Sequence, residues 1–184
     1  FHPFRDDSCR LDTAPPAAFE RSPWPVWHYQ AGGVTIEKSL LPITGHNAVI
    51  VRYRHLAGPA AKLSVTPVTV RRAPSAVQAA HDDAPGMVGG VPGRVHLSLG
   101  EGPPSLTLWH NGSFLPARVW LTRLAYPHDD DGACDDAFVP GHVETALQPG
   151  GMLHLVLADD RELFRTLARE DRLGAPPPAT LAAC

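Results

Sequence analysis

The chain has 184 residues, of which 43% are hydrophobic, and this share is large enough for one domain to bury a core. Lys and Arg total 16 against 19 Asp and Glu, a net charge of −3 with no basic stripe, so we expect no nucleic-acid partner. The longest strand-like apolar run, residues 48–51, is far shorter than the roughly 20 residues that span a bilayer, so we expect no membrane partner. Three cysteines at wide spacing favour a reduced, cytoplasmic chain over a disulfide framework.

The first half of the chain alternates apolar and polar residues with a period of two. The alternation covers residues 34–41 and 49–56, on either side of Thr44-Gly45-His46-Asn47. Two such runs across a turn rich in Gly and Asn predict an antiparallel hairpin. A third run, residues 62–72, changes phase at Thr66-Pro67, where we expect a bulge or an edge position because Pro has no N–H to donate to a ladder.

The second half contains further short strand patterns. Residues 73–92, with several small residues, Gly and Pro, are predicted to be a long connection. Strands are predicted at residues 94–99 and 106–110. Asn111-Gly112 is the strongest short hairpin signal in the chain, so residues 114–124 are predicted to return beside residues 106–110.

The end of the chain changes character. Residues 143–147 and 152–158 flank Gln148-Pro149-Gly150-Gly151, which predicts another hairpin. Residues 159–174 then show the apolar spacing and terminal charges of a helix, and residues 175–184 contain three consecutive prolines, typical of a linker. We therefore predict an all-β fold, an antiparallel β-sandwich over residues 1–158 followed by one C-terminal helix. The chain begins without Met and ends in a short apolar stretch, so we expect it to be one domain of a longer, non-secreted protein.

An acidic cluster, Asp129 to Asp131 with Asp135 and Asp136 beyond it, raises two chemical possibilities. A calcium loop with Gly132 at its sixth position would place Pro127 first and Phe138 twelfth, and neither can be a ligand there. A glycosidase needs two carboxyl groups facing each other across a cleft, and neighbours on one loop are poorly placed for that. We interpret the cluster as a solvated loop and expect no metal and no cofactor.

Aromatic side chains are the other candidates for ligand binding. Trp24, Trp27 and Tyr29 lie close together in sequence, and two further tryptophans, Trp109 and Trp120, lie on either side of Asn111-Gly112. Exposed indole rings could stack on sugar rings, whereas buried ones would fill the core, which we favour for each tryptophan taken singly. Trp109, next to a predicted turn, is the tryptophan that we expect to be most exposed, and His110 beside it is predicted to be solvated.

Several short blocks in order resemble a known family. They are Pro25-Val26-Trp27-His28-Tyr29, Val34-x-Ile36-Glu37-Lys38, Gly45-His46-Asn47-Ala48-Val49-x-Val51-Arg52-Tyr53-Arg54 and Leu63-x-Val65-x-Pro67, followed by Tyr126-Pro127, Asp135-Asp136, Phe138, Pro140-Gly141 and Leu147-x-Pro149-Gly150. This order resembles the N-terminal domain of bacterial and archaeal glycogen debranching enzymes. The resemblance extends to Leu181-Ala182-Ala183, which is similar to the start of the first helix of that family's catalytic domain.

The resemblance implies a supersandwich domain attached to a helical catalytic barrel that hydrolyses α-1,6 linkages. Because that family's acid and base lie in the barrel, the chain alone is expected to be inactive, with the barrel of the same polypeptide and α-glucans (glycogen, maltooligosaccharides) as its partners. Residues 126–141 would then contribute a loop to the substrate groove. The substrate-binding candidates are Trp109, His110, Tyr126, Asp129, Asp135 and Asp136, with no catalytic residue and no metal ligand.

Two alternatives stay open on the sequence. The chain could be an autonomous α-glucan-binding module, which would bind through Trp109 or another exposed aromatic ring; a related possibility is the equivalent sandwich domain of a maltose- or trehalose-type phosphorylase. It could also be a purely structural sandwich domain, because fold does not dictate function.

Overall fold

The structure is a computed structural model, and it describes residues 15–70, 76–77, 79, 88–98, 105–125 and 134–159. Its strands are β1 (Ala18–Glu20), β2 (Val26–Ala31), β3 (Val34–Pro42), β4 (Ala48–Ala57), β5 (Ala61–Val65), β6 (Val88–Val91), β7 (Arg94–Ser98), β8 (Ser105–His110), β9 (Ser113–Ala125), β10 (Cys134–Leu147) and β11 (Met152–Ala158). The described residues contain no helix. The helix predicted at residues 159–174 and the linker after it lie outside the described residues, apart from Asp159.

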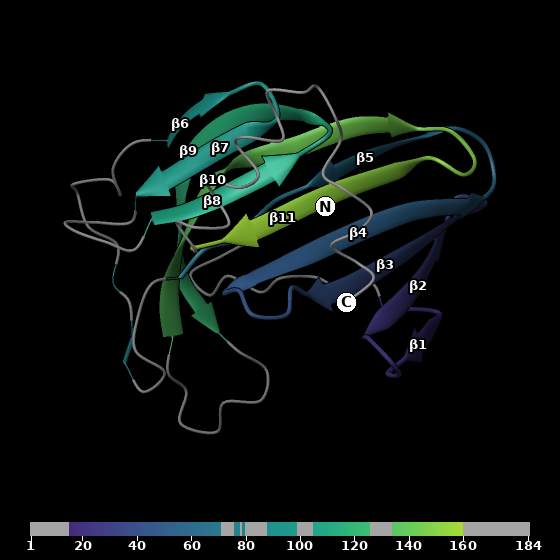
Figure 1. The fold of residues 1–184 in the computed structure, drawn as a ribbon, viewed down its shortest axis with the longest axis horizontal. Helices are drawn as coiled ribbons and strands as arrows, with labels where there is room; N and C mark the ends of the chain where they lie inside the picture. Colours follow the sequence, from purple (N-terminus) through teal and green to yellow (C-terminus); the bar gives the residue numbers. More distant parts are fainter. Residues whose placement is uncertain are drawn as a thin grey trace.

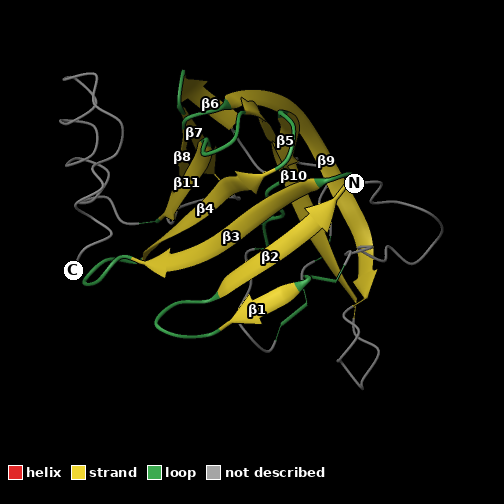
Figure 2. Ribbon diagram, turned by 90° about the vertical axis from the view of Figure 1, so that its right-hand side faces the viewer, coloured by secondary structure: helices red, strands yellow, loops and turns green. Residues whose placement is uncertain are grey.

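The strands form two antiparallel sheets. The larger sheet has eight strands in the order β1-β2-β3-β4-β11-β8-β7-β6, and the smaller has three in the order β5-β10-β9 (Figure 1). Figure 2 shows β1 to β4 side by side at one end of the larger sheet, with the long strands β9 and β10 behind them. The predicted all-β, antiparallel, two-layer fold is therefore confirmed for the described residues.

Apolar side chains from both sheets meet in the main core. Leu153 and Val143 are 0% exposed, the first on β11 of the larger sheet and the second on β10 of the smaller. The buried members of this core cluster are Val95, Leu97, Leu108, Val143, Leu153 and Leu155. On each strand these residues share one phase of the period-two pattern, so alternate side chains face the opposite sheet.

Two hairpins at the N-terminal end of the larger sheet have turns that suit their sequences. β3 and β4 pair from Pro42↔Val49 onward, which confirms the hairpin predicted around residues 44–47. β2 and β3 pair up to Ala31↔Val34, leaving Gly32 and Gly33 as a two-residue turn. Both glycines have positive φ, 57° and 77°, a conformation that other residues adopt only with strain.

The hairpin predicted at Asn111-Gly112 is wrong. β8 pairs with β7 and β11 in the larger sheet, whereas β9 pairs with β10 in the smaller one, so the chain crosses between layers here. The Asn111 side chain binds β11 instead of shaping a tight turn: Nδ2 donates to the Met152 carbonyl at 3.1 Å, and Oδ1 accepts from the His154 N–H at 2.8 Å. Position 112 has no room for a side chain, because a Cβ atom there would lie 2.7 Å from the Glu144 carbonyl oxygen.

The hairpin predicted at residues 148–151 is also wrong. β10 belongs to the smaller sheet, and β11 lies between β4 and β8 in the larger one, as Figure 1 shows. The backbone at the crossing pairs with β4: Gly150 N–H donates to the His55 carbonyl, and His55 N–H donates to the Gly151 carbonyl. The crossing at residues 111–112 therefore separates β8 from β9, and the crossing at 148–151 separates β10 from β11.

Three further predictions need correction or refinement. The long connection at residues 73–92 ends in a strand, β6, which pairs with β7 across Pro92 and Gly93. The run at 62–72 ends as a strand at Val65, and among its described residues beyond Pro67 an isolated bridge joins Thr69 to Phe138. The described part of the predicted loop at 126–141 is strand rather than loop, because β10 begins at Cys134.

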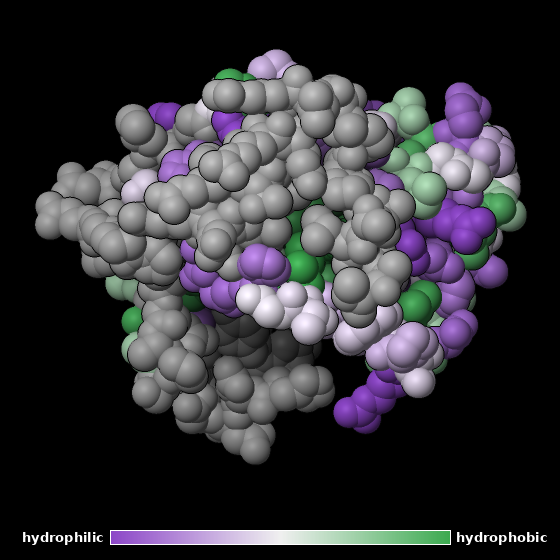
Figure 3. All heavy atoms as spheres, viewed as in Figure 1, coloured by the Kyte–Doolittle hydropathy of each residue, from purple (hydrophilic) through white to green (hydrophobic). Residues whose placement is uncertain are grey.

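The exposed large apolar side chains are spread over the molecule. Figure 3 shows apolar atoms in separate groups among hydrophilic ones on the face turned to the viewer. The exposed large hydrophobic residues come from β1, β4, β6, β9, β11 and the connections, and are Phe19, Trp24, Leu56, Val68, Val70, Val77, Val91, Leu115, Val119 and Met152. Within the described part of the chain, no helix has the length and apolar character needed to cross a membrane.

Candidate functional site

The structure places Trp109 in the interior, so the expectation that it is the most exposed tryptophan is wrong. Trp109 is 6% exposed and belongs to a second core cluster with Ile43, Val156 and Ala158. This cluster lies on the face of the larger sheet that is turned away from the smaller sheet, because Trp109 has the opposite phase to Leu108 on β8. Its indole ring therefore fills a core and has no free face for a sugar ring.

Trp27, another aromatic candidate, packs against neighbouring side chains, whereas Trp24 is 36% exposed. Trp27 stacks against Phe19 with ring centroids 5.3 Å apart, and the Lys38 Nζ atom lies 5.4 Å from the Trp27 ring centroid. The same ammonium group lies 5.9 Å from the Tyr53 ring. Burial lowers the pKa of Lys38, while burial and the nearby Tyr29 raise the pKa of Tyr53 to about 12. Trp27, Lys38 and Tyr53 therefore form a cation–π packing arrangement rather than a vacant platform for sugars.

The predicted acidic candidates do not assemble into a site among the described residues. Tyr126 and Asp129 lie outside the described residues. Asp135 is 2% exposed on β10, and the neighbouring Asp136 accepts a hydrogen bond from the Arg123 backbone N–H at 2.7 Å. Arg123 has a φ of 57° at a register shift between β9 and β10, so Asp136 supports a β-bulge. The interpretation of Asp135 and Asp136 as part of a solvated loop is wrong, because both lie in a strand.

His110, by contrast, lies where a ligand could be recognised, although it is not solvated as predicted. It is the last residue of β8, is 9% exposed, and points to the inner face in phase with Leu106 and Leu108. Its Nδ1 atom lies 3.0 Å from the Gly112 carbonyl oxygen, so Nδ1 carries the proton and donates. Nε2 is buried, and no described group lies within hydrogen-bonding distance of it.

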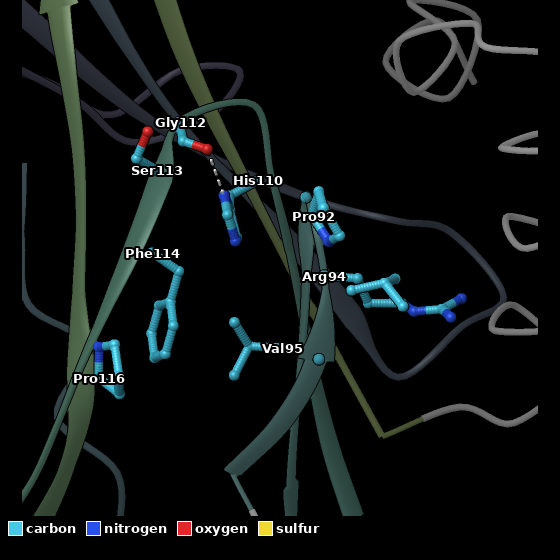
Figure 4. Close-up of a pocket in the computed structure, with 11 residues that line it drawn as sticks. Pro92, Arg94, Val95, His110, Gly112, Ser113, Phe114 and Pro116 are labelled. Atoms are coloured by element: carbon cyan, nitrogen blue, oxygen red, sulfur yellow. Dashed lines mark hydrogen bonds between the residues drawn. The ribbon is translucent and has the colours of Figure 1, made fainter.

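His110 belongs to the wall of a hollow of about 430 Å³. Two segments that are separate in sequence form much of this hollow. They are the β6–β7 turn at Pro92 and Gly93, and the start of strand β9 at Ser113 to Pro116. Figure 4 shows the Nε2 end of the imidazole directed toward the gap between Phe114 and Val95, while the Arg94 guanidinium points away from that gap. The His110 and Phe114 rings lie 6.1 Å apart at 34°. The hollow is within the size range of small-molecule sites, about 300–1,000 Å³.

The chemistry of the hollow is that of a neutral binding site. Apolar side chains (Val95, Phe114, Pro116) surround one buried imidazole acceptor, with no carboxylate among the lining residues. In the part of the chain that the structure describes, no three His, Cys, Asp or Glu side chains are grouped so that they could hold a metal ion. Sequence reasoning missed Phe114 and the Pro92-Gly93 turn, but the shared phase of Leu106, Leu108 and His110 was a local signal that His110 points inward.

Comparison with known proteins decides the family. Residues 17–154, more than half of the chain, match the family described as "Glycogen debranching enzyme N terminal". The chain belongs to this family. Comparison with curated proteins finds no relative that matches it. The match confirms the resemblance seen in the sequence blocks, and its last matched residue lies within β11, the last described strand of the sandwich.

This glycogen debranching enzyme N-terminal domain should lose stability in mild acid. Burial lowers the pKa of His110 despite its hydrogen bond to Gly112, and burial followed by the Arg52 charge lowers the pKa of His154. Unfolded imidazoles bind protons below about pH 6.5, whereas the lowered pKa of these two shifts their protonation in the folded state to lower pH. The free energy of unfolding should therefore be largest above about pH 7 and fall as the pH drops through 6.5.

Urea unfolding at pH 7.5, 6.5 and 5.5 measures this effect. His110→Asn should show a shallower decline than the wild-type domain, because the group that titrates only in the unfolded state is absent. Equal pH slopes for the variant and the wild type would show that His110 does not contribute to the acid sensitivity.

Proposed function

We propose that the chain is the non-catalytic N-terminal domain of a glycogen-debranching glycoside hydrolase that acts on α-1,6 linkages. In this proposal it packs on the helical catalytic domain of the same polypeptide and helps to shape the α-glucan site. The family match over residues 17–154 is the observation that carries the proposal. The two described aspartates of the acidic cluster support a non-catalytic role: Asp135 is buried and Asp136 binds backbone, so they do not face each other across a cleft.

The proposed domain organisation follows the same reasoning. The sandwich domain is proposed to span residues 1–158, and the last described strand, β11, ends at Ala158. A helix at 159–174 and a linker at 175–184 would lead into the catalytic domain. Glycogen and maltooligosaccharides are the proposed substrates of the whole enzyme. The proposed location is the cytoplasm, which the odd number and wide spacing of the three cysteines support.

Co-expression tests the packing on a catalytic domain. The 184-residue chain is produced together with the region that follows it in its own gene, each with a different affinity tag. We expect a one-to-one complex in size-exclusion chromatography with light scattering, and release of glucose from α-1,6 branch points by the complex. Separate elution of the two parts, with equal debranching activity in the presence and absence of the chain, would contradict the proposal.

A control separates domain packing from glucan bridging. The same chromatography is repeated after glycogen has been removed with amylase. A complex that survives this treatment is held by protein contacts, whereas one that disappears is held only by a shared glucan, and that outcome favours the autonomous glucan-binding module instead.

A further inference from the structure

The hollow beside His110 contains an acceptor whose donor is missing from the described residues. Because Nδ1–H donates to the Gly112 carbonyl, the neutral imidazole has its lone pair on Nε2. The His110 side chain is about nine-tenths buried, and Nε2 has no described hydrogen-bond partner. Buried polar atoms in folded proteins almost always have a partner, so the geometry calls for a donor that reaches Nε2 from the hollow.

The surroundings restrict the chemistry of that donor. The group must be neutral, because the lining contains no carboxylate to balance a cation and the Arg94 guanidinium points away from the gap that Nε2 faces (Figure 4). A carboxylate or phosphate without a proton cannot donate to Nε2. A hydroxyl group can donate, and the Phe114 ring next to it offers an apolar surface for carbon-bound hydrogens. Polyhydroxylated rings such as pyranoses combine these two features.

We propose that this hollow binds one glucose unit of an α-glucan, with a sugar hydroxyl donating to His110 Nε2 and the Phe114 ring packing against the sugar's C–H face. The choice of glucose rests on the proposed function, whereas the hydroxyl donor and the apolar contact rest on the hollow itself. The site takes a neutral sugar from outside the sandwich, between the Pro92-Gly93 turn and the start of β9. Neither segment was among the predicted candidates.

The burial of Nε2 also restricts how a sugar can enter the hollow. This atom is buried, so the hydroxyl reaches it only when the Phe114 ring moves while the imidazole keeps its hydrogen bond to Gly112. Phe114 is half-buried at the start of β9, where it lines the hollow and packs against the main core cluster. Ligand binding should therefore change the environments of both rings together.

NMR titration of the isotope-labelled chain with maltotriose tests the site directly. We expect saturable binding in the millimolar range, shifts of the His110 ring nitrogens, and amide shifts clustered at residues 92–95 and 110–114. The Nε2 resonance should move in the direction of a nitrogen that accepts a hydrogen bond. This measurement uses the wild-type chain, so it does not depend on whether any variant folds.

Two substitutions of His110 separate its two nitrogens. His110→Asn keeps a donor near the position of Nδ1 for the Gly112 carbonyl but lacks the Nε2 acceptor, and it should weaken maltotriose binding about three- to ten-fold. His110→Gln carries its amide oxygen close to the position of Nε2 and should recover part of that loss. His96→Asn is the matched control: His96 lies on the other face of β7, with Nδ1 3.1 Å from Thr107 Oγ1, and its replacement should leave the affinity unchanged.

The outcomes separate this site from the proposed function. Maltotriose binding that leaves His110 and Phe114 unshifted, or that His110→Asn does not weaken in a folded variant, overturns the site. No binding at 50 mM, about ten times the expected range, overturns it as well. In either case, a one-to-one complex with the catalytic region would still support the proposed function. Conversely, if that complex does not form but maltotriose still binds at His110, the packing proposal is overturned and the sugar site stands.

Discussion

Replacing Leu153 by alanine should lower the free energy of unfolding by about 2–5 kcal/mol. Leu153 is 0% exposed on β11, and its side chain belongs to the core cluster in which Val143 of the smaller sheet meets Val95 and Leu97 of the larger one. The substitution removes apolar contacts and leaves a cavity between two layers that are held apart by other large side chains. A domain of this size is stable by only about 5–15 kcal/mol, so the loss should be a large part of the total. Urea unfolding followed by tryptophan fluorescence measures it.

Leu115→Ala is the matched control for this experiment. Leu115 has the same side chain but is 44% exposed on β9, so its truncation should lower the free energy of unfolding by less than about 1 kcal/mol. Similar small losses for both variants would mean that the Leu153 side chain is not enclosed between the two sheets, and the two-layer description of the core would then be incorrect.

The strands themselves could be predicted because their signal is local. A side chain's burial in a sheet alternates with position, so the pattern in β3, β4, β7 and β8 is readable from neighbouring residues alone. The pairing partners could not be predicted in the same way. Asn111 binds backbone groups 41 and 43 residues further along the chain, and this contact directs the chain out of the larger sheet. Asn-Gly suits a hairpin turn equally well, so the local sequence does not distinguish the two connections.

Except for His110, the lining of the candidate site could not be predicted for the same physical reason. Pro92-Gly93 and Asn111-Gly112 are each recognisable turn sequences, but the hollow exists only because β7 and β8 pair and β9 then crosses to the other sheet. Trp109 was expected to be the most exposed tryptophan because a turn follows it, whereas the structure buries it against Ile43 and Val156 on the outer face of the larger sheet. The burial of this face depends on residues distant in sequence, which adjacency to a turn cannot reveal.

The crossing at Gly112 leads to the second large prediction. Gly112→Ala should lower the free energy of unfolding by about 2–3 kcal/mol, because the added Cβ would lie 2.7 Å from the Glu144 carbonyl oxygen and 2.8 Å from Val143 Cγ1. Gly112 is absent from the described glycines with positive φ, so the loss comes from overlap between the two sheets and not from backbone strain. Gly33→Ala is the contrasting case, with a φ of 77° and no atom near its Cβ, and should cost about 1 kcal/mol through strain alone.

A double-mutant cycle with Val143→Ala distinguishes these two causes. Removing the Val143 methyl groups relieves part of the overlap at position 112, so Gly112→Ala should be less damaging by about 0.5–1 kcal/mol in the Val143→Ala background. Gly33→Ala should be equally damaging in both backgrounds, because Gly33 has no neighbour within 4 Å of the added atom. If Gly112→Ala instead behaves as Gly33→Ala does, with a loss near 1 kcal/mol and no coupling to Val143, then residues 111–112 form an ordinary hairpin turn and β8 and β9 belong to one sheet.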